Sequence, residues 1–159
     1  MNTNENAASV IDLVVPDFCA ASTGEPFSLS AHRGHPVIIY FYPKDSTPGC
    51  TTEAMQFRDL HEKFTTRGAK IFGVSRDSIK SHQKFKTNLS LPFDLLADTD
   101  ETVCRLFDVI KLKNMYGKDV LGIERSTFLI DSAGKLRHEW RKIKADGHAE
   151  EVLAALLTL

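Results

Sequence analysis

The chain has 159 residues, of which 42% are hydrophobic and 26% are charged, and its formal net charge is -1 at pH 7. These values are typical of a globular protein with a sizeable core, and they exclude the strongly basic character of nucleic-acid-binding or membrane-surface proteins. The length favours one domain spanning residues 1–159.

The first stretch of the chain, residues 1–10 (MNTNENAASV), is polar and is expected to be flexible. It lacks the basic flank and the apolar stretch of a secretory signal, and the apolar runs elsewhere are too short to cross a bilayer. Three cysteines, an odd number, do not make a disulfide framework. We therefore expect a cytoplasmic protein with neither a membrane nor a nucleic-acid partner.

The first half of the chain alternates short apolar runs with helical patterns. Residues 37–42, VIIYFY, are typical of a strand buried on both faces, and residues 70–75, KIFGVS, predict a second such strand. Between them, apolar residues recur at helical spacing from Thr52 until Gly68. This order predicts a βαβ unit with parallel strands and a right-handed crossover.

The next elements are predicted less sharply. A helix is expected over residues 78–88, a third strand over residues 93–98 and a short helix over residues 101–107. Residues 111–119, KLKNMYGKD, show no clear periodicity and are expected to form a polar loop.

The last part predicts an antiparallel hairpin followed by a helix. Residues 126–131 and 135–142 are the two strands, with Gly134 in the turn, and an apolar stripe from Ala149 to Leu157 marks the final helix. A βαβ unit followed by ββα predicts an α/β, thioredoxin-like fold: a central mixed β-sheet flanked by helices, with an N-terminal extension. Flavodoxin-like folds also begin with βαβ, but they do not usually finish on an antiparallel hairpin and a helix.

Cys50 stands where the first predicted strand turns into the following helix, in the stretch FYPKDSTPGCTTEAMQF. The sequence places it just before a helix that begins near Thr51, where unpaired N–H groups and the helix dipole stabilise a thiolate. Pro48 and Gly49 fix the approach of the backbone to the sulfur. A free cysteine is often a small buried hydrophobe, but Cys50 lies outside every apolar stripe, so its position favours a reactive role.

The residues around Cys50 resemble the active-site pattern of the peroxiredoxins, which are thiol peroxidases on a thioredoxin-like fold. The pattern is Pro43-x-x-x-Thr47-x-x-Cys50, and FYPKDSTPGCTTEA as a whole is similar to the Q, or bacterioferritin-comigratory, subfamily. Residues 115–131, MYGKDVLGIERSTFLID, resemble the same subfamily. The resemblance extends from about Pro16 to the C-terminus.

The resemblance implies a role for each matching residue. Cys50 would be the peroxidatic nucleophile that attacks hydrogen peroxide or an organic hydroperoxide and becomes a sulfenic acid. Thr47 would present its hydroxyl to the peroxide, and Pro43 would shield the pocket from water. Arg125 would hold the thiolate and stabilise charge in the transition state, and Glu53 would orient Arg125. Without the resemblance, Arg125 would be taken for a solvated charge at the edge of a strand.

The chain departs from the subfamily in its resolving cysteine. Many Q-type proteins carry this cysteine five residues after the peroxidatic one, where this chain has Met55, and others carry it on the next helix, where residues 78–88 contain none. Cys19 and Cys104 remain, and packing explains both. We expect a one-cysteine cycle in which glutathione, a thioredoxin or a glutaredoxin reduces the sulfenic acid; the alternative is a two-cysteine cycle with Cys104 or Cys19 as resolver. The resemblance favours a monomer over a dimer.

Other patterns predict neither a metal nor a cofactor. His32-x-x-His35 lies in a turn before a strand, which favours a surface turn over a metal site. Glu53 stands where a C-x-x-C motif needs its second cysteine, and no glycine-rich phosphate loop is present. Lys44 and Asp45 are expected to be a solvated loop charge and a local turn-former.

A second class of function remains open from the residues alone. The chain could be a thioredoxin-fold binding module or redox sensor in which Cys50 is incidental. Loss of peroxide in the presence of an external thiol separates the two classes, and the resemblance favours the enzyme.

Overall fold

The computed structural model describes residues 11–159, so the predicted flexible segment 1–10 lies outside the described residues. The strands are β1 (Cys19–Ser22), β2 (Phe27–Ser28), β3 (Val37–Phe41), β4 (Lys70–Ser75), β5 (Asp94–Ala97), β6 (Ile110–Met115), β7 (Lys118–Ile123), β8 (Ser126–Ile130) and β9 (Leu136–Arg141). The helices are the 3-10 helix η1 (Leu29–His32), α2 (Pro48–Thr66), α3 (Ile79–Leu89), α4 (Thr102–Leu106) and α5 (His148–Leu156).

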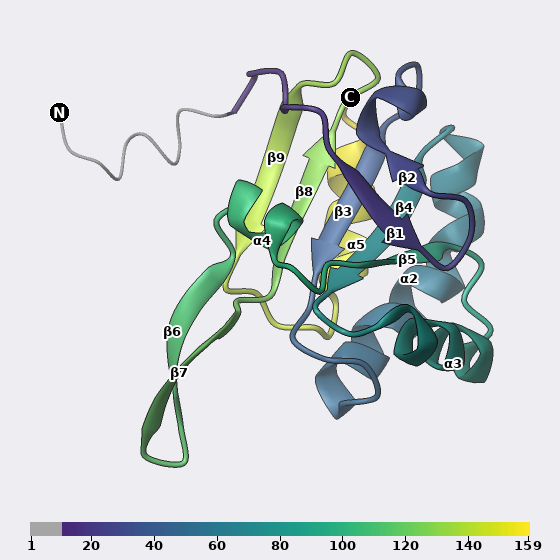
Figure 1. Cartoon of the computed structure of the whole chain (residues 1–159). Coiled ribbons are helices and arrows are strands. Elements are labelled where there is room, and N and C mark those ends of the chain that lie inside the picture. The colour runs from purple at the N-terminus through teal and green to yellow at the C-terminus, as the bar shows by residue number, and fades with distance from the viewer. Residues whose placement is uncertain (1–10) are drawn as a thin grey trace, which may run out of the picture.

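A mixed sheet forms the centre of the molecule (Figure 1). Within residues 11–159 it has seven strands in the order β2-β1-β5-β4-β3-β8-β9, and β6 pairs with β7 in a separate two-stranded sheet. Strands β3, β4 and β5 run parallel, whereas β8 is antiparallel to both β3 and β9. The βαβ unit and the later hairpin are therefore confirmed.

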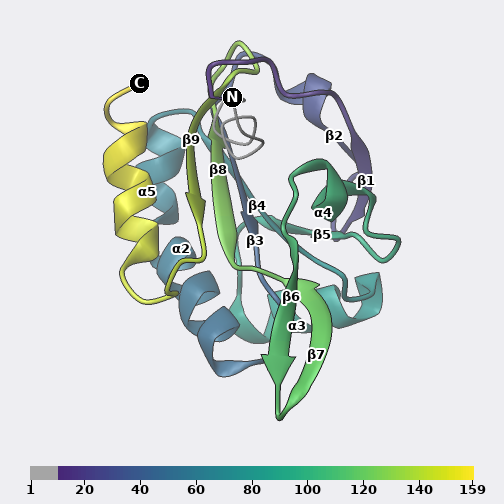
Figure 2. The same cartoon turned by 90° about the vertical axis from the view of Figure 1, so that its left-hand side faces the viewer.

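The two faces of the sheet bury two separate apolar clusters. Along β3, Ile38 and Tyr40 point into the cluster beneath α2 and α5, while Ile39 and Phe41 point into the cluster beneath α4 and the N-terminal segment. Figure 2 shows α2 and α5 together on one side of the sheet, with α4 on the other. Because both faces of β3 are covered, its sequence is continuously apolar. This is the thioredoxin-like arrangement that the sequence predicts.

The helices end and begin with ordinary capping chemistry. Ser78 precedes α3, and its side chain accepts a hydrogen bond from the Ser81 N–H at 3.2 Å. After α2 the chain reverses at Gly68, whose φ of +73° is in the left-handed region that favours glycine.

None of the helices formed by the described residues is both long enough and apolar enough to cross a membrane.

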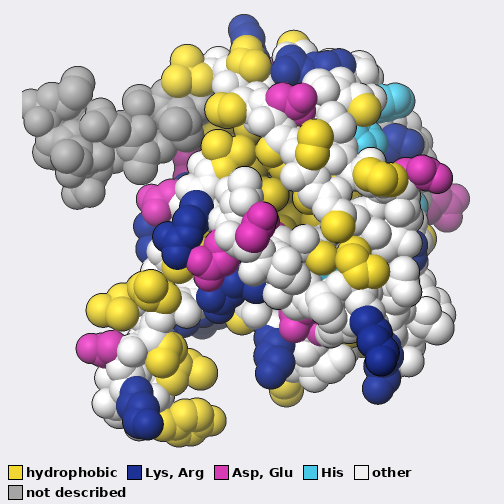
Figure 3. Space-filling view, viewed as in Figure 1, with side chains coloured by type: hydrophobic (Ala, Val, Ile, Leu, Met, Phe, Trp, Pro, Cys, Tyr) yellow, Lys and Arg dark blue, Asp and Glu magenta, His cyan; other side chains and the backbone are white. Residues whose placement is uncertain are grey.

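The predicted polar loop at residues 111–119 is wrong, because the chain forms the β6–β7 hairpin there. Tyr116 and Gly117, with φ values of +55° and +81°, make the two-residue turn. The hairpin extends away from the main sheet (Figure 1), and Figure 3 shows hydrophobic side chains gathered on it. Residues 114–121 are all exposed and Leu112 is 66% exposed, so this part of the hairpin carries no burial pattern. In β7, only Gly122 and Ile123, at the base of the hairpin, are buried.

Candidate active site

The register between two neighbouring strands brings the distant halves of the site together. Phe41 at the end of β3 pairs with Ser126 at the start of β8. Residues 43–47 follow β3 and lead into α2, while Arg125 immediately precedes Ser126. The antiparallel pairing therefore places Arg125 beside the first turn of α2.

Helix α2 begins at Pro48 with Thr47 as its N-cap, three residues earlier than the predicted start near Thr51. Proline fits the first helical position because its fixed φ suits the helix and the N–H that it lacks would have no partner there. The first intrahelical bond runs from the Thr51 N–H to the Thr47 carbonyl at 2.9 Å. Cys50 is thus the third residue of the helix. Its buried sulfur lies at the positive end of the helix dipole.

Arg125 connects Cys50 to a buried carboxylate. Its Nη2 lies 3.5 Å from the Cys50 Sγ, and its Nη1 donates to the Glu53 Oε1 at 2.6 Å. The planar guanidinium can hold both partners at once because its donors have a fixed fork geometry. A Cβ at Gly49 would stand 3.1 Å from the Nη2 atom, so glycine at this position leaves room for the guanidinium.

Glu53 is an unusually costly group to bury. Its side chain is 0% exposed, and its second oxygen, Oε2, has no hydrogen-bond partner among residues 11–159. Burial raises the pKa of this carboxyl to about 7, although the charge and hydrogen bond of Arg125 act in the opposite direction. Burial likewise raises the pKa of the neighbouring Tyr40 well above its usual value, and the charges of Glu53 and Cys50 add to the effect. Arg125 therefore links the Cys50 sulfur to a carboxyl whose ionisation is costly.

Thr47 and Pro43 lie in the loop before Cys50, and both side chains are half-buried. The Thr47 hydroxyl donates to the Lys44 carbonyl at 2.8 Å, which leaves its oxygen lone pairs available as acceptors. Lys44 itself is exposed, as the sequence predicts.

The other two cysteines lie away from this cluster. Cys104, on α4, is 0% exposed in the core on the opposite face of the sheet from Cys50, and its N–H donates to the Asp98 Oδ2 at 2.7 Å. Burial, and then Asp98, raise the pKa of the Cys104 thiol well above its usual range. Cys19 is exposed on β1, so the expectation that packing explains it is wrong, and all three cysteines are free. Met55, in the position of the usual resolver, is half-buried on α2.

Asp45 is more than the local turn-former that the sequence suggests, and that expectation is wrong. It is buried, and its carboxylate accepts hydrogen bonds from Tyr42, Ser81 and His82, at 2.6, 2.8 and 2.7 Å. Two of these partners lie on α3, far along the chain. Nothing in the sequence next to Asp45 indicates them, so sequence reasoning missed this network.

The same network contains a group with the residue types of a metal site. Ligand atoms of Asp45, Asp77 and His82 lie within 4.8 Å of one another. However, both Asp45 oxygens already accept hydrogen bonds, and the Asp77 Oδ2 accepts from the Asp45 N–H at 2.9 Å and from the Ser75 hydroxyl at 2.6 Å. Hydrogen bonding therefore accounts for this cluster without a cation.

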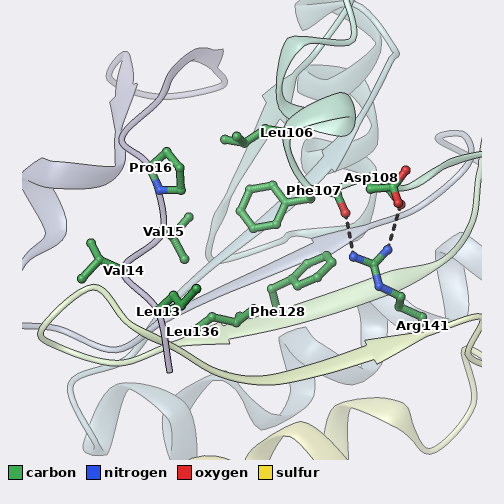
Figure 4. Close-up of a pocket in the computed structure, with 10 residues that line it drawn as sticks. All are labelled: Leu13, Val14, Val15, Pro16, Leu106, Phe107, Asp108, Phe128, Leu136 and Arg141. Atoms are coloured by element: carbon green, nitrogen blue, oxygen red, sulfur yellow. Dashed lines mark hydrogen bonds between the residues drawn. The ribbon is translucent and has the colours of Figure 1, made fainter. Parts of the chain in front are cut away.

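An apolar pocket of about 320 Å³ lies on the other face of the sheet (Figure 4). It is lined by Leu13, Val14, Val15, Pro16, Leu106, Phe107, Asp108, Phe128, Leu136 and Arg141. The Arg141 guanidinium at its edge donates to the carbonyls of Phe107 and Asp108, at 2.8 Å each. Cys50 is not among its lining residues, so this pocket is separate from the cysteine cluster.

The raised pKa of Glu53 predicts a pH-dependent effect of Glu53→Gln on stability. The ordinary pKa of this carboxyl is 4.5, and in the folded protein it is about 7. The contribution of Glu53 to stability is therefore fully present below about pH 4.5 and is lost as the pH rises through about 7. Since glutamine cannot ionise, the free energy of unfolding of the variant should rise relative to wild type across this window, by on the order of 3 kcal/mol.

Urea unfolding of both proteins at intervals from about pH 4 to pH 8 measures this difference. The attraction between Arg125 and ionised Glu53 is already included in the pKa of about 7, whereas changes in packing and in neutral hydrogen bonds add an offset that does not change with pH. The test is therefore the trend with pH rather than the absolute value. A difference in unfolding free energy that stays constant over the whole range contradicts the buried, strongly shifted carboxyl.

Comparison with known proteins agrees with this geometry. Residues 11–139 match the model of the AhpC/TSA family. Peroxiredoxin Bcp of Xanthomonas campestris is 59% identical over 135 residues, which cover 85% of this chain and 84% of that protein.

Solved structures show the same similarity. The bacterioferritin comigratory protein of X. campestris, in structures described as giving insights into its alkyl peroxide reduction activity, has a TM-score of 0.85 and 55% identity over 89% of this chain and 90% of that one. A yeast mitochondrial 1-Cys peroxiredoxin has a TM-score of 0.78 and 25% identity over 92% and 74%. The chain therefore belongs to the AhpC/TSA family, as a peroxiredoxin of the Q, or bacterioferritin-comigratory, subfamily.

Proposed function

We propose that Cys50 is the peroxidatic cysteine of this thiol-dependent peroxidase and that hydrogen peroxide and organic hydroperoxides are its substrates. The observation that carries the proposal is the position of the Cys50 Sγ, in the first turn of α2 and 3.5 Å from the Arg125 guanidinium. Both the helix dipole and the guanidinium favour the thiolate, which is the nucleophilic form. The alkyl peroxide activity described for the X. campestris relative supports the substrate class.

The reaction follows from the charges around the sulfur. The thiolate attacks one peroxide oxygen, a new S–O bond forms and the O–O bond breaks. The sulfur becomes a sulfenic acid, and the other oxygen leaves with the bonding electrons and takes up a proton as water or an alcohol. Negative charge moves from sulfur to oxygen in this step, and Arg125 is placed to stabilise it without reorganising, because Glu53 already holds the guanidinium.

The loop before Cys50 supplies the remaining groups of the proposed site. Thr47, the N-cap residue of α2, has a hydroxyl oxygen that can accept a hydrogen bond from a peroxide while its hydrogen is donated to the Lys44 carbonyl. Pro43 adds a rigid apolar wall that limits water near the sulfur. No step in this scheme requires a metal or an organic cofactor.

We also propose an external thiol as the reductant of the sulfenic acid. Cys104 lies in the core on the opposite face of the sheet from Cys50, and a disulfide requires Cα atoms within about 7 Å. Cys19 is exposed, but it lies on β1, which β5 and β4 separate from β3 in the sheet. The yeast one-cysteine relative, described as resolved through glutathione and thioredoxin systems, supports this cycle. We propose further that residues 1–159 form one domain and that the protein acts as a monomer in a reducing cytoplasm.

The nucleophile is tested by single substitutions of the three cysteines. We expect Cys50→Ser to abolish peroxide consumption with an external thiol, because a serine hydroxyl is not ionised and cannot replace the thiolate. Cys19→Ser and Cys104→Ser serve as matched controls that remove the same atom elsewhere, and both should retain the first turnover. Peroxide loss near the wild-type rate in the Cys50→Ser variant would place the chemistry elsewhere.

The step that reduces the Cys50 sulfenic acid is tested by measuring the intact mass of the protein. Reduced protein receives one equivalent of peroxide without any added thiol, and the intact mass is measured at once. A one-cysteine enzyme gains one oxygen atom at Cys50, whereas an internal or intersubunit resolver produces a disulfide and the loss of two hydrogens. Rapid and complete formation of a disulfide between Cys50 and either Cys104 or Cys19 would overturn the one-cysteine cycle.

A further inference from the structure

His82 is a buried histidine on α3 that contacts the loop carrying the reactive residues. Its side chain is 0% exposed. Its Nδ1 lies 2.7 Å from the Asp45 Oδ2, and its Nε2 lies 2.8 Å from the Leu96 carbonyl oxygen on β5.

The partners of His82 determine where its protons are. The Leu96 carbonyl can only accept, so Nε2 must carry a hydrogen. The Asp45 carboxylate faces Nδ1 while it also accepts from the Ser81 and Tyr42 hydroxyls. A neutral ring would turn its lone pair toward this carboxylate. One additional proton, shared between Nδ1 and Asp45, would complete the network as an imidazolium–carboxylate pair.

The pair matters because of where Asp45 lies in the chain. It precedes Thr47 by two residues, and its N–H donates to the Asp77 Oδ2 at 2.9 Å. The next residue, Ser46, has a φ of +64°, in the left-handed region that non-glycine residues rarely adopt. A strained residue persists only where its surroundings hold it. Here α2 holds the loop on one side of Ser46, and the contacts of Asp45 hold it on the other.

We propose that His82 is a positioning residue of the peroxidase reaction. Its imidazolium holds Asp45, and through Asp45 it fixes the loop of residues 43–47 that presents Thr47 next to Cys50. His82 touches neither the peroxide nor the sulfur. This inference rests on the proposed roles of Cys50 and Thr47.

Two substitutions, the isosteric Asp45→Asn and the uncharged His82→Gln, test the shared proton of the pair rather than its packing volume. In a His82→Gln variant the amide has one donor group and one acceptor, yet it faces two acceptors, Asp45 and the Leu96 carbonyl. The oxygen of the new amide must therefore face one of these two acceptors, and that contact is unfavourable because neither group has a hydrogen to donate. In an Asp45→Asn variant the new amide N–H donates to a neutral His82 ring, and the bond to Leu96 remains. When both substitutions are combined, the new amide N–H donates to the Gln oxygen at position 82, and the bond to the Leu96 carbonyl remains. The Ser81 hydroxyl, which donates to the same Asp45 oxygen in the wild type, turns to accept from the second amide hydrogen.

The readout is the single-turnover rate of peroxide reduction, with thermal unfolding as the check on folding. We expect His82→Gln to slow this rate by roughly tenfold to a hundredfold, because small misplacements of reacting groups are costly. We expect Asp45→Asn to stay within about threefold of wild type, and adding it to His82→Gln should restore the rate to that level. The matched control adds Asp77→Asn to His82→Gln. Asp77 belongs to the same cluster but makes no hydrogen bond to His82, so this change should give no rescue.

A wild-type rate in the His82→Gln variant, or a slow rate that Asp45→Asn does not restore, would overturn the proposal. Nitrogen-15 NMR of the wild-type side chains supplies a readout that does not depend on activity or on any variant folding. Two protonated ring nitrogens on His82 at neutral pH support the assignment, and a neutral ring overturns it. Failure of the proposed function would appear differently, as an inactive wild-type protein in which the His82 ring still carries both protons.

Discussion

The site depends on one buried interaction, the guanidinium of Arg125 held between the Glu53 carboxylate and the Cys50 sulfur. A buried ion pair of this kind rarely increases net stability, because both charges lose their hydration. Glu53 illustrates the cost, since burial raises its pKa to about 7 even beside an arginine. The pair is therefore better explained by the proposed chemistry than by stability, because it holds a cation against the Cys50 sulfur.

Several features of the fold serve that contact. The pairing of Phe41 with Ser126 sets the register of β3 and β8 and thereby places Arg125 beside α2. Gly49 leaves space for the guanidinium, and the early start of α2 brings Cys50 into the first turn. The loop before the helix is then held by α2 and by the buried contacts of Asp45 with α3. Rigid elements therefore fix the sulfur, the cation and the threonine hydroxyl separately, which favours a preorganised site.

The sequence predicts those elements whose faces are buried. The continuous apolar run of β3 and the stripe of α5 follow directly from burial on two faces and on one face, and both predictions are confirmed. The β6–β7 hairpin was missed because its side chains are mostly exposed, although Gly117 marks its turn. Helix α2 was predicted to begin late because Pro48 and Gly49 resemble a turn, whereas proline is also favoured as the first residue of a helix.

Side-chain partnerships between distant segments were the hardest part to predict. The position of Cys50 before a helix indicates a reactive thiol by itself, but only the resemblance to the peroxiredoxins singles out Arg125. The bond between Asp45 and His82 joins residues 37 positions apart and follows no periodic pattern. Strand register and helix packing decide such contacts, and neither can be derived from the residues next to each partner.

The most direct test of the account is the titration of the Cys50 thiolate with and without Arg125. Thiolate absorbance in the ultraviolet is followed from acid to alkaline pH in protein that carries Cys19→Ser and Cys104→Ser, so that Cys50 supplies the signal. If Arg125 stabilises the thiolate, adding Arg125→Gln will shift thiolate formation to higher pH. Superimposable titration curves for the two proteins would contradict the central role of the Arg125–Cys50 contact.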